Sequence, residues 1–161
     1  MRESIGAAWI FSICLTFIIL FTAYLAISVN YAKAFRIKSN IVSMIEENEG
    51  YTGGLEDRII NYLVSEGYTA SGTCEPYIGA NNGYYDGWEL IKEIKMYDNS
   101  TSKSNACIYR RTANSSDDIA NCNSYYKVIA FFKFNVPIIS YFSAFKVGGE
   151  TKMIHDFTTN C

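Results

Sequence analysis

The sequence between Glu3 and Lys33 contains no charged residue and is mostly apolar. Its central run, IGAAWIFSICLTFIILFTAYLAISV from Ile5 to Val29, exceeds the roughly 20 residues that a helix needs to cross the hydrocarbon core of a bilayer. A cleaved secretory signal has an apolar core of about 7–15 residues, and this longer run has no convincing small-x-small exit. The run therefore predicts an uncleaved transmembrane anchor over residues 1–30.

The helical pattern continues beyond the anchor into residues 31–49. On a helical wheel, the apolar residues of this stretch share one half, while serines, asparagines and glutamates take the other. No proline or glycine interrupts the pattern before Gly50, which suits a helix end. We predict one continuous helix from about residue 5 to about residue 49, with an amphipathic stalk as its outer part. Lys38 lies in the apolar half, where a lone cation is costly unless it snorkels or meets an acid, supplied by the head or by another subunit.

The rest of the chain, residues 50–161, predicts a small head. A second helix fits residues 55–67, where an apolar stripe is expected to pack on the stalk; its members are Leu55, Ile59, Tyr62 and Leu63. Turn-forming composition follows to residue 87. Strands are expected over 88–97, 107–112, 125–136 and 146–157, with an apolar loop or short helix at 137–145. The predicted fold class is α+β, with the long helix carrying an antiparallel sheet and a second short helix.

Four cysteines lie outside the anchor: Cys74, Cys107, Cys122 and Cys161. They form no C-x-x-C pair, and a single histidine, His155, cannot complete a zinc site at the usual spacing. Two disulfides are the simplest explanation, which requires an oxidising compartment. Four cysteines allow three pairings, of which we favour Cys107 with Cys122 and Cys74 with Cys161.

The basic residues that follow the anchor favour the opposite, cytoplasmic side of the membrane for the head. Lys33, Arg36 and Lys38 follow it, whereas Arg2 is the only basic side chain before it, and basic residues favour the cytoplasmic side. Charge therefore places the head inside the cell, and cysteine usage places it outside.

Few residue patterns in the sequence indicate a catalytic or ligand-binding site. His155 next to Asp156 lacks a second histidine or a glycine-rich elbow, so we expect no enzymatic activity, no metal, no cofactor and no small-molecule substrate. Arg110 and Arg111 are too few to indicate nucleic acid in a chain of net charge −2. Aromatic residues in a turn-rich stretch, by contrast, are candidates for a surface contact: Tyr84, Tyr85 and Trp88.

The whole layout resembles type IV pilins and their pseudopilin relatives, because a short N-terminus, an apolar helix that extends into a stalk and a Tyr-rich, disulfide-linked sheet follow one another. The run YYKVIAFFKFNVPIISYFSAFKVGGETKMI is more particular. An alternating strand, a proline-marked apolar crossing and a closing strand are similar to minor pseudopilins of the TadE/TadG type from tight-adherence pilus systems. The glutamate that pilins usually carry within the apolar helix has no counterpart here.

The resemblance implies a single-pass structural subunit with a short cytoplasmic N-terminus and an extracytoplasmic head. Such subunits assemble through the N-terminal helix into a pilus or secretion apparatus, so the expected partners are the bilayer and other pilin-like subunits or assembly proteins. The predicted assembly face comprises Ala34, Phe35, Ile37, Lys38, Ile41, Met44 and Ile45. The alternative is a monomeric, membrane-tethered extracytoplasmic binding or adhesion module that uses its Tyr-rich loops.

Overall fold

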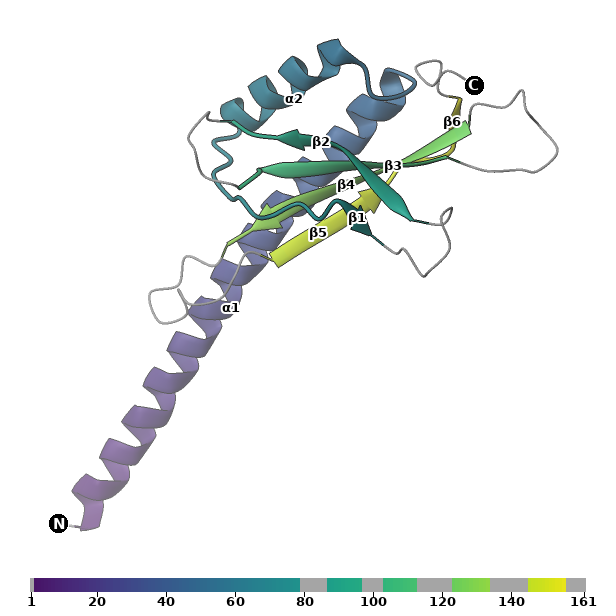
Figure 1. The fold of residues 1–161 in the computed structure, drawn as a ribbon. Coiled ribbons are helices and arrows are strands. Elements are labelled where there is room, and N and C mark those ends of the chain that lie inside the picture. Colours follow the sequence, from purple (N-terminus) through teal and green to yellow (C-terminus); the bar gives the residue numbers. More distant parts are fainter. Residues whose placement is uncertain (1, 79–86, 97–102, 113–122, 134–144, 156–161) are drawn as a thin grey trace.

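The structure is a computed structural model that describes residues 2–78, 87–96, 103–112, 123–133 and 145–155, with the backbone alone for residues 2–5. A long helix, α1 (Arg2–Glu47), projects far beyond a head made of a second helix, α2 (Gly53–Ser65), and a sheet (Figure 1). The strands are β1 (Tyr77–Ile78), β2 (Trp88–Ile94), β3 (Ala106–Thr112), β4 (Asn123–Phe132), β5 (Phe145–Glu150) and β6 (Ile154–His155). The predicted α+β class is confirmed.

The long helix α1 is unbroken over 46 residues. It contains no proline, and its only glycine, Gly6, lies in open space. At its end Gly50 N–H donates to Ile45 O (3.1 Å) and Glu49 N–H donates to Glu46 O (3.3 Å), which is the Schellman arrangement. The left-handed position, with φ 51°, belongs to Glu49. The prediction that the helix ends at Gly50 is therefore confirmed to within a few residues, and Glu49 makes the left-handed turn.

The second helix, α2, packs as predicted. Leu55, Ile59 and Leu63 are buried, and the helix contacts α1. It ends in the same arrangement as α1, with Tyr68 N–H donating to Leu63 O at 3.0 Å. Here a glycine, Gly67, takes the left-handed position with φ 57°. The predicted stop at Gly67 is therefore confirmed.

All strand pairings are antiparallel, in the order β1-β2-β3-β4-β5, and β6 pairs with the start of β4. The strand predicted over 146–157 is thus two strands that share one neighbour, β4. Thr151 lies between them and explains the interruption. Its N–H donates to Tyr126 O (2.8 Å), while its hydroxyl, in place of its carbonyl, accepts from Tyr126 N–H (3.0 Å). The predicted part of the preceding strand and loop at 134–144 lies outside the described residues.

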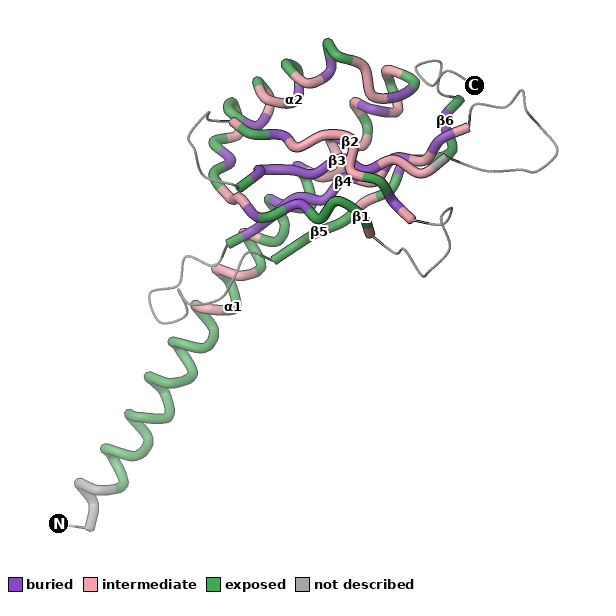
Figure 2. Tube along the Cα trace, in the orientation of Figure 1, coloured by how far each residue is buried: buried purple, intermediate pink, exposed green. Residues whose placement is uncertain are grey.

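The main core lies between the helices and one face of the sheet. Figure 2 shows the buried residues gathered in the head, while the N-terminal part of α1 is exposed. Ile37, Ile41 and Ile45 from α1 meet the three buried residues of α2 there. The sheet contributes side chains that include Ile108, Tyr126, Val128 and Ala130. The predicted alternation along β4 is confirmed for this face.

The opposite face of the sheet is also covered, which the sequence did not predict. Ile129 and Phe131 of β4, on the face that alternation leaves away from α1, are buried beside Cys107 and Tyr109 of β3. The segment between α2 and β1 approaches this face so closely that a Cβ on Gly72 would lie 2.2 Å from the Phe131 ring. The head therefore has two packed layers, of which only one involves helices.

Candidate functional site: the N-terminal helix and its contacts with the head

The N-terminal part of α1 presents apolar side chains outward. The helix is long and apolar enough to cross a membrane, with a mean hydropathy of 2.5 over its most apolar window and no residue of that window buried. Trp9 and Phe17 are 71% and 70% exposed. The hydroxyls of Thr16 and Thr22 donate to carbonyls one turn earlier (2.9 and 3.0 Å), so they are satisfied within the helix, as predicted. This part of α1 is a candidate membrane span.

Beyond the span, α1 turns one stripe of side chains toward the head. The residues on this stripe are at most 1% exposed: Ala34, Ile37, Ile41 and Ile45. They form most of the predicted assembly face, and the chain's own sheet and α2 cover them. Of the remaining residues on that face, Phe35 is 49% exposed, while Lys38 and Met44 are half-buried. Phe35 is therefore the member of the predicted face that stays open to another subunit.

The contacts of Lys38 are with side chains and backbone of its own chain. Its aliphatic stem lies over β5, where a Cβ on Gly149 would come within 2.3 Å of Lys38 Cδ. Its ammonium lies 4.0 Å from the centre of the Phe35 ring, a cation–π contact. Within the described parts of the chain no carboxylate forms an ion pair with it. Of the two arrangements considered for Lys38, the structure shows packing on its own head.

The other two cations of the stalk also contact the head. Lys33 Nζ donates to Gly67 O (3.3 Å) at the end of α2. Arg36 Nη2 donates to both carboxylate oxygens of Glu66 (2.8 and 3.0 Å), and this bonding raises the pKa of the Arg36 guanidinium. The cations that argued for a cytoplasmic head therefore have a structural role that does not depend on the side of the membrane.

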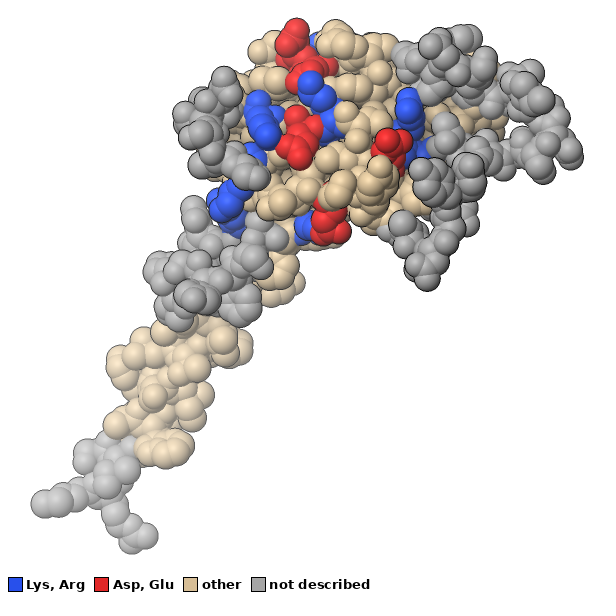
Figure 3. Space-filling model, in the orientation of Figure 1, with Lys and Arg blue, Asp and Glu red and all other residues tan. Residues whose placement is uncertain are grey.

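A pocket of about 380 Å³ lies where α1 leaves the head, and we name it the basal pocket. Figure 3 shows basic side chains at the edge of the head beside the uncharged part of α1. The lining comes from α1, from the segment after α2 and from the end of β4: Asn30, Lys33, Gly67, Tyr68, Thr69, Ala70, Phe132 and Lys133. The Tyr68 hydroxyl donates to Phe131 O, and burial raises the pKa of this tyrosine. Tyr68 is therefore a fixed, neutral part of the wall.

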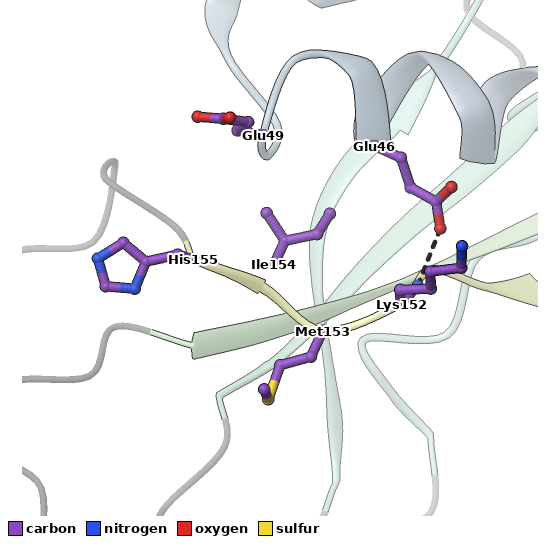
Figure 4. Close-up of a pocket in the computed structure, with 6 residues that line it drawn as sticks. All are labelled: Glu46, Glu49, Lys152, Met153, Ile154 and His155. Atoms are coloured by element: carbon purple, nitrogen blue, oxygen red, sulfur yellow. Dashed lines mark hydrogen bonds between the residues drawn. The ribbon is translucent and has the colours of Figure 1, made fainter.

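A second pocket, of about 430 Å³, lies at the opposite end of the head, where α1 ends. Figure 4 shows that Glu46 reaches toward Lys152, whose backbone N–H donates to Glu46 Oε1 (2.9 Å), while the His155 ring points away from Glu46. Glu49, Met153 and Ile154 complete the lining. In the described parts of the chain, no three His, Cys, Asp or Glu side chains gather in a way that could hold a metal ion. The pocket therefore presents separate charges and no convergent acid–base set.

Trp88, expected at a surface contact, is instead 7% exposed. It belongs to the core on the sheet face opposite α1. Arg111 and Lys127 lie 5.2 and 5.0 Å from its ring centre. The assignment of Trp88 to a free surface was wrong, because its strand pairs within the sheet and turns the ring inward. Tyr84 and Tyr85 lie outside the described residues.

The disulfide of the described chain joins Cys74 to Cys107, with a Cα–Cα distance of 5.7 Å. The favoured pairings of Cys107 with Cys122 and of Cys74 with Cys161 were therefore wrong. Cys74 and Cys107 are bonded to each other, so neither of them is available for the favoured partner. Cys122 and Cys161 lie outside the described residues, and Cys14 is a free, exposed thiol on α1.

Sequence reasoning missed the contacts that depend on three-dimensional proximity. Gly149 and Gly72 provide room for the side chains of Lys38 and Phe131, which lie far from them in the sequence. Lys133 follows β4, and no pattern in the sequence brings it to the same pocket as Lys33. Comparison with family models, with curated proteins and with solved structures finds no match for this chain.

Proposed function

We propose that this chain is a membrane-anchored, pilin-like structural subunit that assembles through its N-terminal helix into a pilus or secretion apparatus. The observation that supports this most is the division of α1, whose outer half is core for the head while its N-terminal part is exposed and apolar. Such a helix can exchange lipid for neighbouring helices without exposing apolar surface to water. This geometry therefore suits assembly, a function that requires no chemical reaction.

The head is proposed to lie on the extracytoplasmic side. The Cys74–Cys107 disulfide supports this, because disulfides persist in oxidising compartments. Long domains also translocate largely regardless of the flanking charge. Labelling of intact cells with an impermeant thiol reagent, before and after external reduction, tests this side. Exposure of new thiols only after reduction is expected.

The burial of the stalk's apolar stripe narrows the surface through which subunits would meet. On α1, the exposed large apolar side chains belong to the span itself and to the aromatic residues just beyond it. Tyr31 and Phe35 stack with ring centres 6.5 Å apart, and each is about half exposed (48% and 49%). We therefore propose that helices bundle through the span and through this aromatic pair.

The second candidate is a membrane-tethered binding module that acts as a monomer. One observation favours it: once the head covers the apolar stripe, the outward side of the stalk around Ser43 and Glu47 is polar. A stalk of this kind is stable in water without a partner. In this case the span anchors the chain and contributes nothing to association.

A charge at Phe35 separates the two candidates. Phe35→Glu places a carboxylate at the proposed contact between subunits, where its desolvation is costly, so higher-order complexes should be lost. Ser43→Glu, at an exposed stalk position, is the matched control and should assemble as the wild type does. The measurement is the size distribution of complexes extracted from membranes in mild detergent.

Oxidative crosslinking in the bilayer provides a second readout. Cys14 is exposed on the span, so an assembled chain should give a disulfide-linked dimer that Cys14→Ser abolishes. A wild-type chain that remains monomeric in both experiments contradicts assembly and supports the tethered module.

A further inference from the structure

The basal pocket lies at the depth where a bilayer presents its headgroups. Asn30 and Lys33 line it, and they follow Val29, the end of the apolar run, by one and four residues. At 1.5 Å per residue, Lys33 stands about 6 Å beyond the run along the helix axis. The headgroup layer adds roughly 5 to 8 Å on each side of the hydrocarbon core. A helix that crosses the bilayer with this run therefore sets the pocket among the headgroups.

Two lysines line the pocket without a carboxylate partner. Lys33 comes from α1 and Lys133 follows β4, and both are exposed. Among the described residues neither forms an ion pair with an acid. The connection that follows Lys133, residues 134–144, contains no acidic residue. The pocket therefore concentrates two positive charges that the described chain leaves uncompensated.

Neighbouring cations at this end of the head differ in this respect. Arg36 lies 2.8 Å from Glu66, and Lys146, at the start of β5, lies 2.5 Å from Glu75. Both of these cations have an acid of the same chain as a partner. Lys33 and Lys133, like Lys38, have no acidic partner among the described residues, and of these three cations Lys33 and Lys133 are the ones that line the pocket.

The remaining lining suits a phosphate group that is attached to an apolar molecule. The side chains of Asn30 and Thr69 add an amide and a hydroxyl, which can donate to phosphate oxygens. Lys33 has three N–H donors and uses one for Gly67 O, so others remain for a ligand. Phe132 supplies an apolar wall on which a glycerol backbone or the first part of an acyl chain can pack.

We propose that the basal pocket binds the phosphate of an anionic phospholipid, with Lys33 and Lys133 as its cationic contacts. Such binding holds the head at a defined height and rotation on the membrane surface. The proposal depends on membrane insertion of α1 and is independent of assembly into a filament. A monomeric chain that fails the assembly test can therefore still pass the test of this site.

The test uses the full chain, delipidated in a non-ionic detergent and titrated with phosphatidylglycerol, with bound lipid counted by native mass spectrometry. Replacing both lysines (Lys33→Gln with Lys133→Gln) should weaken binding roughly thirtyfold, about fivefold for each lysine. The control pair, Arg58→Gln with Lys152→Gln, removes the same charge at exposed positions outside the pocket and should bind as the wild type does. Because all four side chains are exposed, each variant should retain the Cys74–Cys107 disulfide, which the same spectra report.

Two further arms identify the ligand. Phosphatidylcholine with the same acyl chains should bind more weakly than phosphatidylglycerol, and inorganic phosphate at millimolar concentration should not displace the lipid. Equal affinity of the lysine variant and the control variant for phosphatidylglycerol overturns the proposal. Displacement by inorganic phosphate overturns the lipid as ligand and identifies free phosphate instead.

Discussion

The two helices end in the same hydrogen-bonding arrangement with different residues in the left-handed position. Gly67 takes this position after α2 without steric cost, whereas Glu49 takes it after α1 with φ 51°. A non-glycine residue in this region costs roughly 1–2 kcal/mol. Glu49 therefore holds a strained conformation at the tip of α1, next to the pocket formed with Lys152 and His155.

Replacing Glu49→Gly should raise the free energy of unfolding of the head by about 1 kcal/mol, because the strain is relieved. The measurement is urea unfolding of the full chain in detergent, followed by near-UV circular dichroism. Glu47→Gly is the matched control. It lies in the last turn of α1 and should lower the stability by up to about 1 kcal/mol. Equal losses in the two variants would contradict a left-handed Glu49.

At the scale of elements, the contact between α1 and β5 depends on two adjacent glycines that play different roles. A Cβ on Gly149 would meet the Lys38 side chain at 2.3 Å, whereas a Cβ on Gly148 would meet only Lys127 Cε at 3.7 Å. Neither glycine has a positive φ. Gly149 therefore leaves room for the flexible end of the Lys38 side chain, whereas Gly148 has no such close neighbour.

Gly149→Ala should destabilise the head by up to about 1 kcal/mol, because the end of the Lys38 side chain has to move off β5 and gives up its contact with the Phe35 ring, while Gly148→Ala should change the free energy of unfolding little. Combining Gly149→Ala with Lys38→Ala should recover part of the loss, because the shortened side chain leaves room for the methyl group. Thermal and urea unfolding of these three variants and of Lys38→Ala alone measure this coupling. Additive losses in the double variant would show that Lys38 does not lie on Gly149.

The helices and strands were largely predictable from the sequence, whereas the residues at which they begin and end were less predictable. The second helix, the stripe on the stalk and the strands around residues 88–94 and 123–132 follow from hydrophobic periodicity, and the structure confirms them. The division of the last predicted strand was missed because it depends on the Thr151 hydroxyl, which replaces a backbone acceptor opposite Tyr126. Hydrophobic periodicity indicates which face of the sheet a residue occupies. It does not indicate where a side-chain hydroxyl takes the place of a backbone acceptor.

At the scale of the whole molecule, the Cys74–Cys107 disulfide ties the segment after α2 to the sheet face opposite α1. This segment helps cover a second core that contains Trp88, Ile129 and Phe131. The disulfide closes a sequence separation of 33 residues. It therefore holds in place the one layer of the head that no helix supports.

Removing the disulfide with Cys74→Ala and Cys107→Ala should lower the free energy of unfolding by about 4 kcal/mol, from the loop entropy released in the unfolded chain. Cys14→Ala, on the exposed part of α1, is the control and should leave the head's stability unchanged. Peptide mapping should recover Cys74 linked to Cys107. In a chain with all four cysteines of the head oxidised internally, that leaves Cys122 for Cys161. A Cys107–Cys122 peptide would contradict the structure.

The sequence by itself determined the long apolar helix, the α+β class and the face of β4 that turns toward the helix. These properties follow from local composition and period, because an apolar run or an alternation selects its environment whatever the rest of the chain does. Only the tertiary structure decided that the stalk's apolar stripe is covered by its own head, that Cys107 pairs with Cys74, and that Lys33 and Lys133 share one pocket. Each of these joins residues far apart in the chain, and strand order and register decide such proximity.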